Sequence, residues 1–496
     1  MQPIPAERLF IANQQPISEG GHYILYWMRA ARRTGWNFAL QHALHQAVVL
    51  AKPLLILETL ACDEPLASLR HHHFALDGMA VNARRLRDKP ALYYPFVERG
   101  PQEIAGLMEE LARTSCLIIT DDHPLLWMRK ELNDMAERLP VRLDAVDGNG
   151  LLPLQAADRD FTRAYSFRRF LQQLLPGHLF LLPEADPWRD IELPPPRAIP
   201  KKILQRWPQA DPGLLDPGRR IPADLPLALK PDRVQKTGGS EAAEQLWQDF
   251  LEEKLARYAA DRNQPEQDVT SGLSPYLRWG HISSHQMVSE LLQSRNWSPA
   301  DLSPEQKGKR RGWWGLGENT EAFLDQLVTW RELGYIHCAR NDDYDRFDAL
   351  PDWAQKTLLA HADDPRPFLY DKEELESART HDPLWNAAQR QLLTEGRLHN
   401  YLRMLWGKKI LQWTRSPRQA LDILIELNDR YAIDGRDPNS YSGITWCLGQ
   451  FDRAWGPERP IFGKIRYMSS ENTARKVSVK NYLKRYGSED PKKTLK

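Results

Sequence analysis

Three tryptophans, Trp385, Trp406 and Trp413, are the residues whose type and spacing most directly suggest chemistry. Trp406 and Trp413 lie seven residues apart in a run with helical periodicity, so two turns of helix would place both indoles on one face, about 10 Å apart. We expect Trp385 to lie on a preceding helix that packs nearby. A row of oxidisable indoles suits one-electron chemistry on a bound ring cofactor. The alternative is that each Trp is simply a large core residue, which is the commoner role for any one of them.

Four segments of distinctive sequence include or follow these tryptophans: THDPLWNAAQ (380–389), LHNYLRMLWGKKILQW (398–413), LNDRYAIDGRDPN (427–439) and ERPIFGKIRYM (458–468). In content and order they resemble the class II cyclobutane pyrimidine dimer photolyases. The resemblance implies a deoxyribodipyrimidine photo-lyase, a carbon–carbon lyase for DNA repair. In that family, blue light excites fully reduced FAD, an electron passes to the pyrimidine dimer, and the cyclobutane ring splits. Trp385, Trp406 and Trp413 would relay electrons from the surface to the flavin.

The same resemblance assigns residues to the flavin. The string TSGLS (270–274) offers hydroxyl and N–H groups before a helix, which can cradle phosphate, although most such strings are plain helix caps. Arg403 and Asp434 would form an ion pair beside the isoalloxazine, with Asn428 near its N5 atom. The string around Asp434 is also typical of a turn-rich surface loop. The residues assigned to FAD are Tyr258, Thr270, Ser271, Leu273, Ser274, Arg331, Arg403, Asn428, Asp434 and Gly435.

A second group of residues would hold the damaged bases, which photolyases draw out of the duplex into a pocket. Gln326 and Trp330 are four residues apart on an expected helix, so they share a face. By resemblance, Trp330 and Trp446 would clasp the two bases, and Met404 would pack against them as a soft surface. Class II enzymes usually carry Glu where this chain has Gln326. A Gln side chain donates hydrogen bonds but is not a useful acid.

Two departures from the family keep alternatives open. The first is Gln326 itself, for which Asp325 is a poor substitute, because it faces about 100° away on an ideal helix. The run CLGQFDRAW after Trp446 is one residue shorter than the family's spacing, which leaves the role of Asp452 open. The main alternative is a class II photolyase-like flavin photoreceptor, similar to a cryptochrome, with little or no repair activity. A light-independent flavoprotein or nucleotide-binding scaffold is a third, which the row of tryptophans argues against.

Composition and charge restrict the partners. The chain has 496 residues and a net charge of +1, so binding to UV-damaged DNA requires a local basic patch. The four Cys are scattered without a CxxC pair, which indicates a cytoplasmic protein. We find no signal-peptide pattern and no apolar run of 18 residues, so we expect no membrane-spanning segment. We expect a monomer. The residues expected to contact DNA phosphates are Lys408, Lys409, Lys464 and Arg466.

The first 150 residues alternate short apolar runs with helical stretches. The runs are YILYWM (23–28), PLLILET (53–59), CLIITD (116–121) and VRLDAV (141–146). This pattern predicts an α/β domain with a Rossmann-like parallel sheet. After the first run the chain reads RAARRTGWN rather than GxGxxG, so we do not expect a dinucleotide at that turn. The resemblance implies that such a domain can hold a second, antenna chromophore, whose identity the sequence leaves open.

Proline density marks the next boundary. Residues 182–233 are rich in proline, which blocks helix interiors and central strands, and from residue 240 the pattern becomes helical. We therefore expect an α/β antenna-type domain at 1–150, a connector at 151–239 and an all-helical FAD-binding catalytic domain at 240–496. The consecutive residues His71, His72 and His73 would point in different directions on a helix, so we expect no metal site there.

Overall fold

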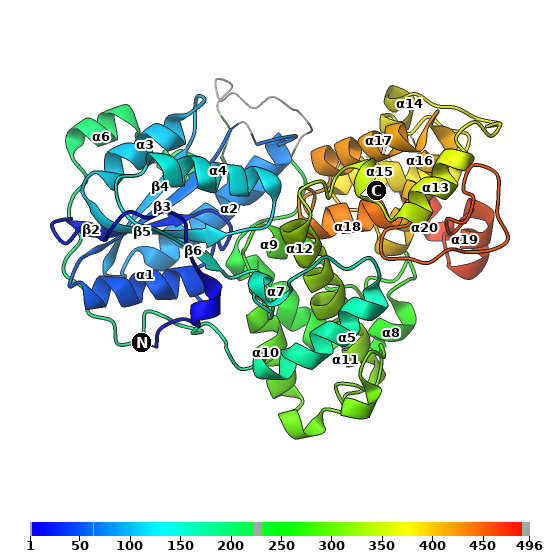
Figure 1. Ribbon diagram of the computed structural model, residues 1–496. Coiled ribbons are helices and arrows are strands. Elements are labelled where there is room, and N and C mark those ends of the chain that lie inside the picture. The colour runs from blue at the N-terminus through cyan, green and yellow to red at the C-terminus, as the bar shows by residue number, and fades with distance from the viewer. Residues whose placement is uncertain (1, 63, 220, 222–230, 232, 489–496) are drawn as a thin grey trace. The chain divides into compact units, whose positions relative to one another are not determined.

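The computed structural model describes residues 2–62, 64–219, 221, 231 and 233–488. The chain divides into two compact units, whose elements are labelled in Figure 1. Unit 1 consists of Met1–Asp158, Leu174–Trp247 and Leu273–Trp297, and unit 2 consists of Arg159–Gln173, Gln248–Gly272 and Ser298–Lys496. Each unit is therefore built from separate stretches of the sequence.

Unit 1 contains a six-stranded sheet with the order β1-β6-β5-β2-β3-β4. Strand β1 pairs antiparallel with β6, and all the other neighbours are parallel. All residues of β2 and β3 are buried, as expected for parallel strands that helices cover on both sides. The strands are β1 (Leu9–Ile11), β2 (Tyr23–Met28), β3 (Leu54–Leu60), β4 (Ala91–Val97), β5 (Ser115–Asp122) and β6 (Leu143–Asp147).

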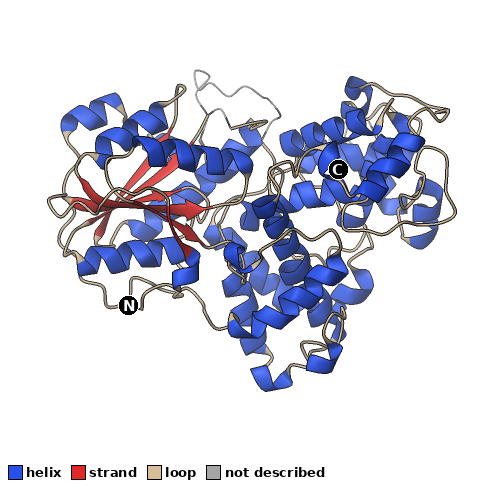
Figure 2. Ribbon diagram, in the orientation of Figure 1, coloured by secondary structure: helices blue, strands red, loops and turns tan. Residues whose placement is uncertain are grey.

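Helices cover both faces of this sheet (Figure 2). Because side chains alternate along a strand, Trp27 of β2 joins the core on one face and Tyr26 joins the core on the other. The first core includes apolar residues of α3 (Glu103–Ala112) and α4 (Leu126–Arg138), and the second includes those of α1 (Phe38–Val49). The prediction of an α/β domain with a parallel sheet is confirmed, with the difference that the edge strand β1 is antiparallel to β6.

The units cut across the expected boundary at residue 240, because a later segment packs on unit 1. Tyr276 lies with its ring centroid 5.0 Å from that of Phe74. Gly280 has a φ of +68°, and a Cβ there would lie 1.8 Å from the carbonyl oxygen of Ala30, so only glycine permits this approach. Other helices of unit 1 are α2 (Leu69–Leu86), α6 (Lys201–Arg206), α9 (Ser274–Arg278) and α10 (Ser284–Ser294), and α7 (Ser240–Asp249) ends at the division between the units.

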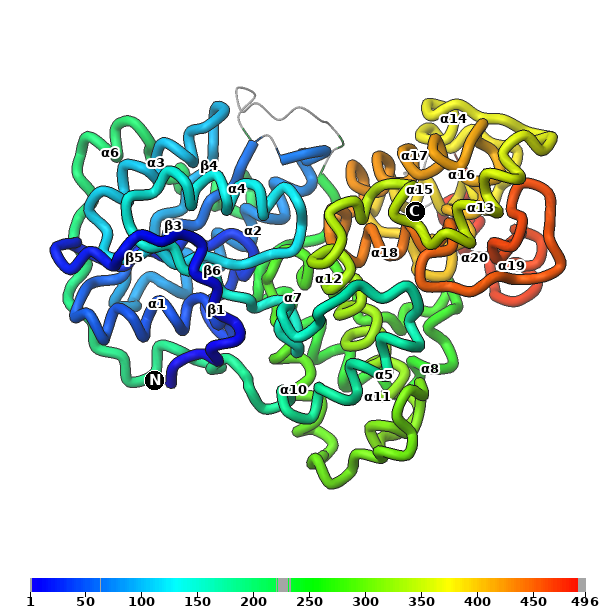
Figure 3. Tube along the Cα trace, in the orientation of Figure 1, coloured from blue at the N-terminus to red at the C-terminus, as the bar shows by residue number. Residues whose placement is uncertain are grey.

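The regular elements of unit 2 among its described residues are helices, joined by loops that include two isolated β-bridges, and its path can be followed in Figure 3. Helix α15 begins at an N-cap, Asp382, whose carboxylate accepts hydrogen bonds from the first turn, and it ends at Gly396, which is left-handed. Helix α16 packs between α15 and α17. The helices are α5 (Ala164–Leu174), α8 (Tyr258–Asp261), α11 (Glu318–Leu324), α12 (Arg331–Arg340), α13 (Asp352–Ala360), α14 (Lys372–Glu376), α15 (Pro383–Glu395), α16 (Asn400–Trp413), α17 (Pro417–Tyr431), α18 (Pro438–Trp446), α19 (Ser470–Lys476) and α20 (Lys480–Tyr486). Among the described helices of both units, none is long and apolar enough to cross a membrane.

Candidate active site

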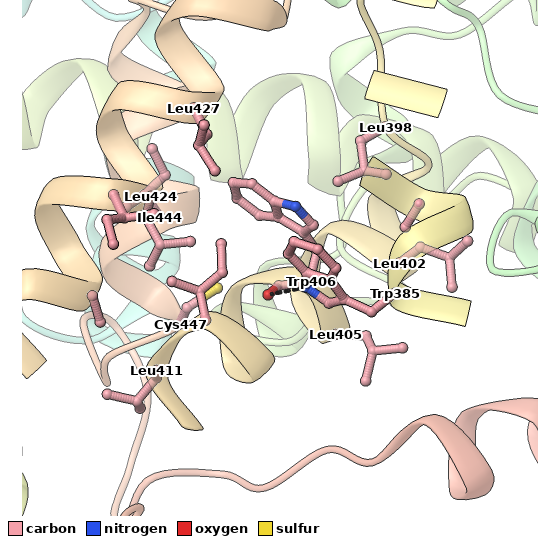
Figure 4. Close-up of a cluster of buried hydrophobic side chains, with 14 of the residues drawn as sticks. Trp385, Leu398, Leu402, Leu405, Trp406, Leu411, Leu424, Leu427, Ile444 and Cys447 are labelled. Carbon is pink, nitrogen blue, oxygen red and sulfur yellow. Dashed lines mark hydrogen bonds between the residues drawn. The ribbon is translucent and has the colours of Figure 1, made fainter. Parts of the chain in front are cut away.

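The three tryptophans lie together in the core of unit 2. Each is at most 2% exposed. The rings of Trp385 and Trp413 meet edge to face, with centroids 5.5 Å apart. The indole nitrogen of Trp385 donates to the backbone oxygen of Trp406 at 3.0 Å, shown as a dashed line in Figure 4. The indole nitrogen of Trp406 donates in turn to Gln389 at 2.8 Å. These contacts hold the indoles in a connected group, in which the ring nitrogens of Trp385 and Trp406 donate to uncharged oxygen atoms.

Beyond Trp413 lie three ring side chains that the sequence analysis did not single out, the half-buried Tyr370 and the exposed His381 and Phe368. The ring of Trp413 lies 5.5 Å from that of Tyr370 and 5.3 Å from that of His381. The Tyr370 hydroxyl and His381 Nδ1 are 2.6 Å apart. Phe368, which is 46% exposed, stacks on His381 at 3.8 Å. The signals for this cluster in the sequence are that His381 lies within the distinctive 380–389 segment and that Tyr370 lies ten residues before that segment.

The pair expected beside the flavin forms as an ion pair in the structure. Arg403 on α16 donates to the Asp434 carboxylate at 3.0 Å. The loop that carries Asp434 is held by Ser440, whose hydroxyl donates to the Asp434 backbone oxygen at 2.8 Å. The turn also requires Gly435, because a Cβ there would lie 2.8 Å from the backbone oxygen of Asn428. The segment is therefore an ordered part of the helical core, not a loose surface loop.

Asn428 is held in one orientation by its neighbour. It is 2% exposed, and its amide nitrogen donates to Asp429 Oδ1 at 3.0 Å. Burial raises the pKa of Asp429, and hydrogen bonds from the Arg436 backbone (2.9 Å), Asn428 and the Tyr441 hydroxyl (2.9 Å) favour its ionised form. Because a carboxylate only accepts hydrogen bonds, the amide nitrogen must face it. The carbonyl end of Asn428 is then the end that can accept from an N–H group.

The residues expected around the flavin phosphates lie in both units. Tyr258, Thr270 and Ser271 belong to unit 2, and the ring of Tyr258 packs edge to face on Phe250 and Phe323. Leu273 and Ser274 belong to unit 1, where they begin α9. Arg331 is buried in unit 2, with its guanidinium 4.2 Å from the ring centroid of Tyr335. The Tyr335 hydroxyl donates to Asp437 at 3.1 Å, which fixes the ring on which the Arg331 guanidinium packs.

Trp330 and Trp446 lie side by side in unit 2, with their ring planes inclined at 56°. Their ring centroids are 5.9 Å apart, and both side chains are half-buried, so each keeps an accessible surface. Gln326 and Trp330 lie on Asp325–Trp330, which is a π-helical segment and not the ordinary helix that the spacing predicts. Such wider turns occur frequently at functional sites. Asp325 is held by Arg168 at 2.8 Å, so it does not replace the missing acid at Gln326.

Two of the four lysine and arginine residues expected to contact DNA are buried. Lys408 is 1% exposed and Lys409 is 6% exposed, so the expectation that they form a solvated basic patch is wrong. Lys409 lies 3.8 Å from Asp382 and over the ring of Trp413, so it is part of the core packing. Helical periodicity could not predict their burial, because α16 is buried on nearly all sides and has no separate polar face.

The other two residues of that set are exposed. Lys464 forms an ion pair with Glu458 at 3.2 Å, and the guanidinium of Arg466 lies 5.1 Å from the ring centroid of Trp455. Arg453 lies 4.6 Å from the same ring. The indole nitrogen of Trp455 donates to Asp452 at 3.2 Å, which places the Asp-x-x-Trp element in an ordered surface loop. This loop presents cationic and aromatic groups together.

Two features of unit 1, the consecutive histidines and the turn after β2, have structural contacts within the unit. His71 Nδ1 lies 2.8 Å from the Ser68 hydroxyl, and His72 Nδ1 bonds the Ser68 backbone oxygen, so both close the start of α2. At the turn after β2, Asp121 accepts hydrogen bonds from the three successive backbone N–H groups of residues 29–31. A carboxylate of the chain therefore occupies the donors that a phosphate would use. No cluster of three metal-ligating side chains occurs among the described residues.

Comparison with known proteins identifies the family. No family model matches the chain. Deoxyribodipyrimidine photo-lyases from Methanothermobacter thermautotrophicus, Oryza sativa subsp. japonica and Potorous tridactylus are each 34% identical, over 97%, 93% and 94% of this chain and 98%, 87% and 81% of theirs. A solved structure of a bacterial class III photolyase from Agrobacterium tumefaciens superposes with a TM-score of 0.63 at 17% identity, covering 94% of this chain and 86% of that one. The chain therefore belongs to the deoxyribodipyrimidine photo-lyase family of enzymes. The resemblance drawn from four short segments is confirmed at the level of the family.

Proposed function

We propose that this protein repairs cyclobutane pyrimidine dimers in UV-damaged DNA in a light-dependent reaction with FAD as its cofactor. The observation that supports this most is the adjacent, half-buried pair Trp330 and Trp446, which lies in the same unit as the ion pair Arg403–Asp434 and the buried group of tryptophans. A half-buried pair of indoles offers flat apolar surface to a base that has left the duplex. Photolyases among the relatives supply the reaction class.

The residues of unit 2 fit a flavin. When bound, FAD would supply the absorption of light and the one-electron chemistry that splits the cyclobutane ring. Arg403, held by Asp434, would place a fixed guanidinium beside the ring system, where it favours negative charge. The carbonyl end of Asn428 would accept a hydrogen bond from a ring N–H, because its amide nitrogen is committed to Asp429. The tight turn at Gly435 keeps Asp434 close to Asn428, so that both groups lie at the same site.

The lesion would be held by side chains around the indole pair. Trp330 and Trp446 would contact the two pyrimidines, and Met404, half-buried on α16, would supply an adaptable surface. Gln326 would donate a hydrogen bond to a pyrimidine carbonyl but would not deliver a proton. The exposed Lys464 and Arg466 would neutralise phosphates beside the extracted dimer. Trp406, Trp385 and Trp413 would form the path for electrons that reduce the cofactor.

The test is repair of an oligonucleotide that contains one thymine dimer. The purified protein with chemically reduced FAD should restore the undamaged sequence under blue light and not in the dark, with light-exposed protein lacking FAD as the control. A photoreceptor without repair is the second candidate, favoured by Gln326 in place of an acid. Absence of repair with a fully reduced flavin, together with normal photoreduction, would select the photoreceptor.

A further inference from the structure

Lys408 is a buried cation with a defined acceptor. Its side chain is 1% exposed, and its ammonium donates to the backbone oxygen of Cys447 at 2.6 Å. Cys447 is the C-cap of α18, so the ammonium lies at the end of a helix where unpaired carbonyl groups concentrate negative charge. A lysine at this place connects the middle of α16 to the last turn of α18.

The junction between the two helices is too close to tolerate much adjustment. A Cβ on Gly407, the residue before Lys408, would lie 2.5 Å from Cys447 Sγ. The backbone of α16 therefore packs directly on the thiol, and the Lys408 side chain extends from this contact point to the carbonyl of the same residue. Two adjacent residues of α16 thus fix the position of Cys447.

Both partners of this junction adjoin residues of the proposed lesion pocket. Trp446 precedes Cys447 in the chain, so the carbonyl that accepts from Lys408 is one residue from the indole. Met404 precedes Lys408 by four residues on α16, which places the two side chains on one face of the helix. The junction thus joins the helix face that carries Met404 to the helix end that carries Trp446.

We propose that Lys408 is a positioning residue, which fixes Trp446 relative to the Met404 face of α16 and thereby sets the affinity for the lesion. The proposal rests on the function proposed above. A buried ammonium costs desolvation free energy that an apolar side chain of the same length would avoid. The benefit of lysine at this position is therefore the orientation of the α18 end.

The position of Trp446 then depends on the charge of Lys408. Burial lowers the pKa of the Lys408 ammonium to about 8, with the Cys447 thiol and Asp452 opposing the shift and Arg466 adding to it. Above that pH the neutral amine loses its charge-assisted bond to the helix end. Lesion affinity should therefore fall as the pH rises from 7 to 9.

The first test compares Lys408→Met with the parent protein, both loaded with FAD. We expect the Kd for dimer-containing DNA at pH 7 to rise about tenfold, because Trp446 would adopt the binding orientation in only about a tenth of the molecules. Repair at saturating DNA, the flavin spectrum and the thermal midpoint should stay close to the parent values. The parent Kd should rise towards pH 9 and the variant Kd should not. Lys356→Met, on the exposed side of α13, is the matched control and should leave all of these unchanged.

The second test needs no DNA and does not depend on Lys408→Met. In protein labelled with 5-fluorotryptophan, the ¹⁹F resonance of Trp446, assigned by its loss in Trp446→Phe, should shift with a midpoint near pH 8. A resonance that does not move between pH 7 and 9, or a Kd with the same pH dependence in Lys408→Met as in the parent, would overturn the proposal. If the protein binds no lesion but the resonance still titrates, the proposed function fails while the coupling of Lys408 to Trp446 holds.

Discussion

Replacing Asn428 with Asp tests the orientation on which the flavin assignment depends. The Asn428 amide nitrogen lies 3.0 Å from Asp429 Oδ1 and donates to it. In Asn428→Asp that donor becomes an oxygen, so two carboxylates face each other in a buried site. At 3.0 Å and an effective dielectric constant of about 20, the repulsion is about 5 kcal/mol if both are ionised. Rotation of the new side chain relieves part of it, but the site is buried and its donors are already fixed.

The loss of stability in Asn428→Asp should grow as the pH rises. Repulsion raises the pKa of the new carboxyl group in the folded state above its unfolded value, which is about 4. At pH 4 the group is neutral in the folded state and about half protonated in the unfolded state, so little stability is lost and Asn428→Asp should unfold close to the parent temperature. As the pH rises the unfolded state loses the proton first, so stability falls, and at pH 7 the midpoint should drop by about 10 °C.

Thermal unfolding followed by circular dichroism between pH 4 and 8 measures this directly. Asn428→Ala is the matched control, because it loses the same hydrogen bond without adding charge. Its cost should be about 1–3 kcal/mol and should vary little with pH. A midpoint for Asn428→Asp that stays parallel to that of Asn428→Ala across this range would refute the proposed orientation of the amide.

Three further outcomes follow from the site. Trp406→Phe should abolish photoreduction of bound FAD while leaving its absorption spectrum intact, whereas Trp188→Phe in unit 1 should photoreduce normally; unchanged kinetics in the first variant would remove Trp406 from the relay. Gln326→Glu should raise the repair rate, by up to about 10²-fold if proton delivery limits it, and an equal single-turnover rate would show that it does not. Gly435→Ala should cost about 1–3 kcal/mol and weaken FAD retention, because its Cβ would lie 2.8 Å from the Asn428 backbone oxygen; full stability by denaturant titration would contradict that contact.

The sequence predicted those features that depend on local periodicity or on a distinctive string. The alternation of apolar runs and helices gave the parallel sheet, and the segments from residue 380 onwards identified the family. The ion pair of Arg403 and Asp434, 31 residues apart, came from the resemblance and is present in the structure, although its place beside a flavin stays a prediction.

Features set by tertiary packing were not accessible from the sequence. Lys408 and Lys409 look like surface residues because lysine is rarely buried, yet a helix end and Asp382 compensate their charges. The π-helical turn at Asp325–Trp330 differs from an α-helix by one extra residue per turn, which no composition signal reports. Helices α9 and α10 read as part of the helical half, but their apolar faces pack on unit 1.

The chain passes between the two units five times, after residues 158, 173, 247, 272 and 297. A fragment ending at residue 239 would therefore lack α9 and α10, and would leave Phe74 without the Tyr276 ring that packs on it. Such a fragment should be prone to aggregate, because the apolar side of α2 around Phe74 would lose the segment that covers it. During synthesis the first unit cannot be completed until residues 273–297 have left the ribosome, and by then two segments of the second unit have already been made.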